Sequence, residues 1–164
     1  MSTELNKHVA LEIGDVLFMD IVGYSKLSLN EQRGAVDELN RVVRGSDEFR
    51  KGESENRLLK IPTGDGMALV FYASPEAPVQ CAIEISRALK AHPSLRLRMG
   101  VHCGPVSGVV DVKGQANLAG AGINLAQRVM DCGDAGHILV SQHAAEDLAE
   151  LEKWRPLLHD LGTY

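Results

Sequence analysis

Residues 16–23 read Val-Leu-Phe-Met-Asp-Ile-Val-Gly, an apolar run that is interrupted by one carboxylate and ends at a glycine. A run of this length and composition predicts a buried β-strand. Burying Asp20 without a partner is costly, so we expect this carboxylate to meet a cation or several hydrogen-bond donors. Capping the strand end through a backbone amide is the simplest structural role for the same residue.

The sequence around this strand alternates helical periodicity with pairs of short apolar runs. Ser28 and Glu31 have the spacing of a capping box and indicate a helix start. The predicted elements after the first strand are, in chain order, a helix over about 29–50, strands over 58–61 and 67–72, a helix over 74–92, a strand over 95–102, a strand pair around 106–112, a loop over 113–122, a helix over 123–130, a strand over 137–140 and a helix from residue 142. This order predicts an α+β fold, with helices covering one side of a mostly antiparallel sheet.

Length and composition indicate one globular domain with an acidic balance of charge. The 164 residues include 17 Lys and Arg against 22 Asp and Glu, a formal net charge of −5, and only three Phe, three Tyr and one Trp. These numbers exclude a basic, ring-lined surface for polymeric nucleic acid. No apolar run approaches the ~20 residues of a membrane helix, and the three cysteines form no CxxC pair. We therefore expect a cytoplasmic protein with reduced thiols.

A second carboxylate, Asp65, lies in the turn-forming segment 62–66 between two predicted strands. Asp is common in turns, and this is its simplest role. Neighbouring strands lie about 4.8 Å apart, so Asp20 at a strand end and Asp65 at a hairpin tip could share a hard cation such as Mg²⁺ or Mn²⁺. Gly23 would let backbone amides approach an anion.

Five segments resemble the class III nucleotidyl cyclase catalytic domains, in the order found in that family. Phe18–Ser25 is similar to the F-x-D-I-x-G-[FY]-[ST] signature, and Thr63–Ala68 to the second metal-aspartate turn. The other three are Arg98–Val106, which resembles R-x-G-[IV]-H-x-G-x-V, Gly122–Arg128, which resembles the V-N-x-A-x-R helix, and Asp134–Ser141, which resembles the strand after it. The resemblance implies a ferredoxin-like, palm-type catalytic domain over residues 1–164.

The resemblance also implies roles for single residues. Asp20 and Asp65 would bind two Mg²⁺ or Mn²⁺ ions, with the Ile21 carbonyl as a further ligand. The residues implied for binding the triphosphate are Val22, Gly23, Tyr24 and Ser25, which would cradle it, and Arg98, which would contact phosphate.

Asn124 would position the ribose, and Arg128 would stabilise charge on the phosphoryl group in the transition state. Their spacing alone places both on one face of a helix. Family cyclases place the metal aspartates and this helix on opposite subunits of a head-to-tail dimer, which implies a homodimer with two shared active sites.

The positions that select the base depart from the family's patterns. Adenylyl cyclases usually carry a Lys four residues before the second metal Asp, and here that position is Ile61, with Lys60 one residue early. A shift of one residue in a strand turns a side chain to the other face. The second base position aligns with Asn117, whose amide both donates and accepts hydrogen bonds. The base therefore stays open among ATP, which is slightly favoured, a pyrimidine triphosphate (UTP or CTP) and GTP.

We accordingly predict an enzyme that converts a nucleoside triphosphate to a 3′,5′-cyclic monophosphate and pyrophosphate. The alternative is a catalytically silent domain that binds nucleotide or dimerises to regulate a partner. The full set of Asp20, Asp65, Asn124 and Arg128 favours the enzyme. The segment 111–120 is shorter than the usual dimerisation arm, and the family's last strand, with its phosphate-binding Lys, would begin at about residues 161–164. We expect that the chain is truncated there or that the pocket lacks this Lys.

Overall fold

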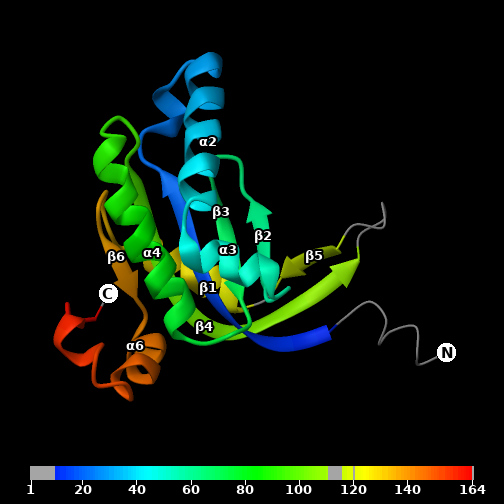
Figure 1. Cartoon of the computed structure of the whole chain (residues 1–164), viewed down its shortest axis with the longest axis vertical. Helices are drawn as coiled ribbons and strands as arrows, with labels where there is room; N and C mark the ends of the chain where they lie inside the picture. Colours follow the sequence, from blue (N-terminus) through cyan, green and yellow to red (C-terminus); the bar gives the residue numbers. More distant parts are fainter. Residues whose placement is uncertain (1–9, 111–115, 120, 164) are drawn as a thin grey trace.

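A six-stranded sheet forms the centre of the protein, with the strand order β2-β3-β1-β4-β5 and with β6 paired to β4 (Figure 1). The computed structural model describes residues 10–110, 116–119 and 121–163. The strands are β1 (Ala10–Ile21), β2 (Leu58–Pro62), β3 (Gly66–Phe71), β4 (Leu97–Val110), β5 (Ala116–Ala119) and β6 (Ile138–Val140). Every pairing is antiparallel except that of β4 with β6. The prediction of a mostly antiparallel sheet is confirmed.

Helices cover both faces of this sheet. The α-helices of the described residues are α2 (Leu29–Arg44), α3 (Asp47–Ser54), α4 (Glu76–Ala88), α5 (Ala121–Asp131) and α6 (Gln142–Ala149), and the 3₁₀ helices are η1 (Tyr24–Lys26), η2 (Leu89–Ala91) and η3 (Arg155–Leu157). A larger core joins α2, α3, α4 and α6 to one face, and a smaller core joins α5 to the other. The prediction that helices cover one side only is wrong. No helix in the described part of the chain has the length and apolar character to cross a membrane.

The central strand β1 explains why both faces need cover. Leu17 and Met19 pack into the larger core, whereas Val16 and Phe18 pack into the smaller one. An uninterrupted apolar strand is typical of a strand buried on both faces, because alternate side chains point to opposite sides.

The single helix predicted over 29–50 is in fact two helices, α2 and α3. The buried Ser46 separates them, and its hydroxyl oxygen accepts a hydrogen bond of 3.2 Å from the backbone N–H of Phe49 at the start of α3. The first N–H groups of a helix have no carbonyl partner within that helix, and this capping bond supplies a partner for one of them at the start of α3. The capping box of Ser28 and Glu31 is confirmed at the start of α2.

Strand β4 is continuous through Pro105, where the sequence suggested a break between two strands. β6 pairs with residues 99–101 and β5 with residues 107–110. Pro105 lies between these two ladders, so its missing N–H removes no pairing with either strand. The sequence predicts a loop over 113–122, and this prediction is wrong for residues 116–119, which form β5.

Candidate active site

The carboxyl end of β1 and the start of β3 bring the two predicted metal ligands together. Asp20 is 8% exposed and lies directly opposite Gly66 in the ladder. The backbone N–H of Ile21 donates a 2.8 Å hydrogen bond to the carbonyl oxygen of Asp65. Asp65 therefore directly precedes the neighbouring strand β3 at the level of Asp20, as the sequence predicted.

Gly66 makes this close approach feasible. A Cβ atom at this position would lie 2.0 Å from the backbone oxygen of Met19 and 2.7 Å from the Cα atom of Asp20. Both neighbours are backbone atoms, which cannot move aside without separating β1 from β3. The glycine thus sets the spacing of the two strands where the carboxylates meet.

Arg98 supplies the cation that the buried Asp20 requires. The two residues face one another across the ladder of β1 and β4, with Nε 3.0 Å from Oδ1 and Nη2 2.7 Å from Oδ2. This two-point pairing is the strong geometry for a guanidinium and a carboxylate. The hydrogen bonds to Asp20 raise the pKa of Arg98 above its ordinary value.

Asp131 is a member of the site that sequence reasoning missed. It is the last residue of α5, and its Oδ1 lies 3.3 Å from Nη2 of Arg98. A carboxylate at a helix C-terminus opposes the helix dipole, and this local mismatch is the signal that it needs a basic partner.

The site carries more negative than positive charge. Asp20 and Asp131 contact the Arg98 guanidinium, and the charge of Asp65 also acts on it. Three carboxylates against one guanidinium leave a formal charge of −2. Carboxylate and carbonyl oxygens are the ligands that Mg²⁺ and Mn²⁺ prefer. Asp20, Asp65 and the backbone of Ile21 therefore fit a divalent hard cation in both charge and donor type.

The segment after Asp20 turns sharply away from the sheet. Gly23 adopts a left-handed conformation with φ 77°, directly before the single turn of η1. This conformation favours glycine. Tyr24 packs against the larger core, whereas Ser25 is exposed. Of the residues predicted to cradle phosphate, Val22 and Gly23 are nearest in the chain to Asp20, and Tyr24 is engaged elsewhere.

The two predicted catalytic residues of α5 share one face of that helix, as expected, but they face solvent. Gly122, Ala126 and Met130 form the buried side of α5, whereas Asn124 and Arg128 are exposed. The buried side lies close against β4. Within the described chain, the structure brings Asp131 to the carboxylate site and leaves Asn124 and Arg128 on the outer surface of the helix.

The two candidate base-selecting residues of β2 lie on opposite faces of the sheet. The Lys60 ammonium donates a hydrogen bond to the side chain of Asn40 on α2, and burial lowers its pKa. Ile61 packs against the smaller core, on the α5 side of the sheet that Asp20 also faces. Lys60 therefore lies on the face of the sheet away from Asp20. This agrees with the prediction that a shift of one residue along the strand turns the side chain to the other face. Asn117 lies on β5, opposite Val109 of β4.

Known proteins resemble this chain in sequence family and in fold. The model of the adenylate and guanylate cyclase catalytic domain matches residues 11–155. The fold resembles a monomeric double mutant of the guanylyl cyclase domain of the RhoGC fusion protein from the aquatic fungus Blastocladiella emersonii, at 22% identity, a TM-score of 0.72 and 87% coverage of each chain. It also resembles the guanylate cyclase domain of RhGC from Catenaria anguillulae in complex with GTP, at 23% identity, a TM-score of 0.70 and coverage of 85% and 84%.

An adenylyl cyclase is also among the similar structures. The adenylyl cyclase CyaB from P. aeruginosa is 17% identical, with a TM-score of 0.68 and coverage of 87% of this chain and 83% of that one. No curated protein sequence matches the chain significantly. Likeness at this identity establishes the fold, and the match of the family model over residues 11–155 establishes the family. The chain belongs to the adenylate and guanylate cyclase catalytic domain family.

Proposed function

We propose that the protein cyclises a nucleoside triphosphate to its 3′,5′-cyclic monophosphate, with release of pyrophosphate, and that it uses two Mg²⁺ or Mn²⁺ ions. The observation that carries the proposal is the buried Asp20 beside Asp65, in a site whose formal charge of −2 one guanidinium does not neutralise. A silent regulatory domain has no physical need for paired carboxylates with excess negative charge, since their mutual repulsion costs stability.

Asp20, Asp65 and the carbonyl of Ile21 would hold the ions. When bound, the ions would lower the pKa of the ribose 3′-hydroxyl and offset the charge of the triphosphate, in the two-metal manner. Asp20 offers the same oxygens to a divalent ion that it now offers to Arg98. Competition for these oxygens would release part of the Arg98 guanidinium, which is partly exposed and could then donate to a phosphate.

Arg128 and Asn124 complete the proposed chemistry. Arg128 would place fixed positive charge where the phosphoryl group becomes most negative, and arginines in comparable roles contribute roughly 10³ to 10⁵ in rate. Asn124 would donate and accept hydrogen bonds at the ribose and so align its 3′-hydroxyl. Val22, Gly23 and Ser25 would contact the triphosphate.

We infer further that these two residues act in the active site of a second copy of the chain. Asn124 and Arg128 project from the outer face of α5, away from the buried side that packs on β4. Leu125 lies between them in sequence and is 38% exposed. A helix face that combines an exposed leucine with two polar side chains suits a polar interface. A symmetric homodimer would contain two such shared sites.

The base is the least constrained part of the proposal. Ile61 faces the side of Asp20 and has no hydrogen-bonding group with which to recognise a base, whereas Lys60 is held by Asn40. Asn117 can donate and accept, which suits more than one base. We retain ATP as the slightly favoured substrate, with UTP, CTP and GTP as alternatives that follow the same mechanism.

A substrate screen tests the proposal. The protein is incubated with Mn²⁺ and with each of ATP, GTP, CTP and UTP, and the products are identified by mass spectrometry. We expect a cyclic monophosphate from at least one triphosphate. Asp65→Ala should abolish it, and Asp37→Ala, which removes an exposed carboxylate on α2, should not. Nucleotide binding without any cyclic product would support the silent domain instead.

A further inference from the structure

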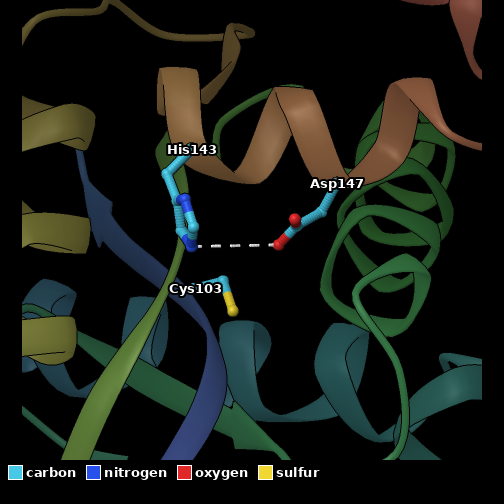
Figure 2. Close-up of side chains that lie close together, drawn as sticks. All are labelled: Cys103, His143 and Asp147. Atoms are coloured by element: carbon cyan, nitrogen blue, oxygen red, sulfur yellow. Dashed lines mark ion pairs between the residues drawn. The ribbon is translucent and has the colours of Figure 1, made fainter.

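A second group of metal-binding side chains lies where α6 crosses β4, on the face of the sheet opposite to Asp20 (Figure 2). Cys103 belongs to β4, and His143 and Asp147 are four residues apart on α6, so they share one face of that helix. One ligand atom from each of the three side chains lies within 4.8 Å of the other two. Figure 2 shows His143 and Asp147 reaching toward one another from the helix, with Cys103 below them on the strand.

The surroundings of the sulfur are acidic. Cys103 is only 9% exposed, and two carboxylates act on its thiol, those of Asp147 and of Asp15, its neighbour across the ladder on β1. Burial and these two carboxylates raise the pKa of the Cys103 thiol to about 12. In the described part of the chain, neither Asp15 nor Asp147 forms an ion pair with a lysine or an arginine.

These surroundings disfavour a nucleophilic cysteine, although Cys, His and Asp side chains are adjacent. A reactive cysteine needs positive charge or donors that favour its thiolate, whereas Cys103 lies beside two carboxylates that disfavour it. A divalent cation has the opposite effect, since it displaces the thiol proton and balances the carboxylate. With one thiolate, one carboxylate and one neutral imidazole as ligands, a divalent ion gives a set of formal charge zero.

We propose that Cys103, His143 and Asp147 form a zinc site that is separate from the catalytic centre, with the fourth position open to water. A sulfur, a nitrogen and an oxygen ligand form a donor set that Zn²⁺ accepts and that Mg²⁺ does not prefer. Tetrahedral zinc at ordinary bond lengths holds its ligand atoms about 3.4–3.6 Å apart. The present separation of His143 Nε2 from Asp147 Oδ2 is 4.0 Å, so small side-chain rotations close the site. Binding transfers the Cys103 proton to solvent and forms the zinc–sulfur bond.

The consequence of such a site is structural. Only Ala144 and Leu148 of α6 belong to the larger core, and α6 has eight residues. A metal bound to both α6 and β4 would add a cross-link between the helix and the sheet. Cys103 lies opposite Asp15 of β1, which is five residues before Asp20. The proposed zinc site is also on the other face of the sheet, so the ion would not contact the nucleotide. This inference does not depend on the proposed cyclase activity.

Cobalt is the appropriate spectroscopic probe, because a thiolate ligand to Co²⁺ gives a charge-transfer absorption that oxygen ligands do not. The full chain is stripped of metal with a chelator, supplied with excess Mg²⁺ and titrated with Co²⁺. We expect the thiolate band to saturate at one Co²⁺ per chain and to be lost on addition of Zn²⁺. Zinc should also raise the melting temperature of the metal-free protein.

Variants decide whether the band comes from this site. Cys103→Ser and His143→Ala should lose the band and the zinc-dependent rise in melting temperature. His143 is exposed, so its replacement leaves the core intact and keeps the test valid even if Cys103→Ser folds poorly. The matched controls Cys132→Ser and Asp65→Ala should retain both signals. Absence of a thiolate band in the native protein, or its persistence in His143→Ala, overturns the proposal.

Discussion

Arg98 holds the carboxylate of Asp20 with both ends of its guanidinium, across the ladder that joins β1 to β4. Removing the arginine leaves a buried carboxylate without its partner, and we expect Arg98→Ala to lower the free energy of unfolding by about 1–3 kcal/mol. Because a divalent cation can replace the lost charge, Mn²⁺ should raise the melting temperature of this variant more than that of the native protein. Thermal denaturation with and without Mn²⁺ measures both effects.

The control for this first prediction is the double variant Asp20→Asn with Arg98→Ala, which has neither charge. It should be more stable than Arg98→Ala alone in the absence of metal, and it should not respond to Mn²⁺ at this site. Equal responses of the single and double variants would show that Asp20 does not bind the ion.

Gly66 is predicted to be essential for the carboxylate site. In Gly66→Ala the added methyl group would collide with the backbone of Met19 and Asp20, and overpacking of this kind costs about 1–3 kcal/mol or more. We expect lower stability together with loss of cyclase activity, because the collision separates β1 from β3 where Asp20 and Asp65 meet. Gly34→Ala is the matched control, since Gly34 lies in α2 with no atom within 4 Å of an added Cβ. It should stabilise the helix by up to about 1 kcal/mol.

The shared active site predicts complementation between two inactive proteins. Asp65→Ala lacks a proposed metal ligand, and Arg128→Ala lacks the proposed transition-state charge. If each site draws these residues from different copies of the chain, a heterodimer has one intact site. Random pairing of equal amounts should therefore restore about a quarter of the native activity. An inactive mixture, with heterodimer formation established by native mass spectrometry, would contradict shared sites.

The three cysteines should differ in reactivity. Cys81 is fully buried, and burial raises its pKa to about 12. Cys103 has a raised pKa of about 12 for the reasons given above, and Cys132 is exposed. We expect a maleimide to label one thiol quickly in the metal-free native chain at pH 7 and all three after denaturation. If the rapidly labelled thiol is Cys132, the variant Cys132→Ser should show no rapid labelling. Rapid labelling of that variant would contradict the burial of Cys81 and Cys103.

A pH-dependent contribution to stability is predicted where the C-terminal segment meets α4. Lys153 and Trp154 donate hydrogen bonds to the carboxylate of Glu76, with 2.9 Å between Trp154 Nε1 and Glu76 Oε1, and they lower the pKa of Glu76 below its ordinary 4.5. The ionised form therefore stabilises the fold above about pH 4.5, and this contribution is lost as the pH falls through the lowered value. Glu76→Gln should reduce stability by about 0.5–1 kcal/mol at pH 7. Chemical denaturation of both proteins should show this difference shrink below about pH 4.

The sequence predicts most of the order of the elements and the adjacency of Asp20 and Asp65, because both depend on local patterns, but it misses the division of the first helix and the course of β4 and β5. The apolar run around Asp20 predicts a buried strand, and the turn around Asp65 predicts a hairpin tip. The same run also contains the evidence that both faces are covered, since Val16 and Leu17 point to opposite sides and are both buried. The prediction of helices on one side overlooked this alternation.

Other features depend on contacts between distant segments and could not be predicted. The Arg98 partner of Asp20 is 78 residues away and follows from the register of β1 and β4. Likewise, Cys103 meets His143 and Asp147 only because α6 folds back across β4. The division of the helix over 29–50 is an intermediate case, because Ser46 carries a capping signal that the longer helical periodicity obscured.

The most direct test of the central claim measures both products of one reaction. The protein and Mn²⁺ are incubated with the triphosphate that gives the strongest signal, and cyclic monophosphate and pyrophosphate are quantified over time. The proposed function predicts equal amounts of the two, formed at the same rate, and neither from Asp65→Ala. Absence of a cyclic monophosphate from all four triphosphates, with the folded protein present at the end of the assay, would contradict it.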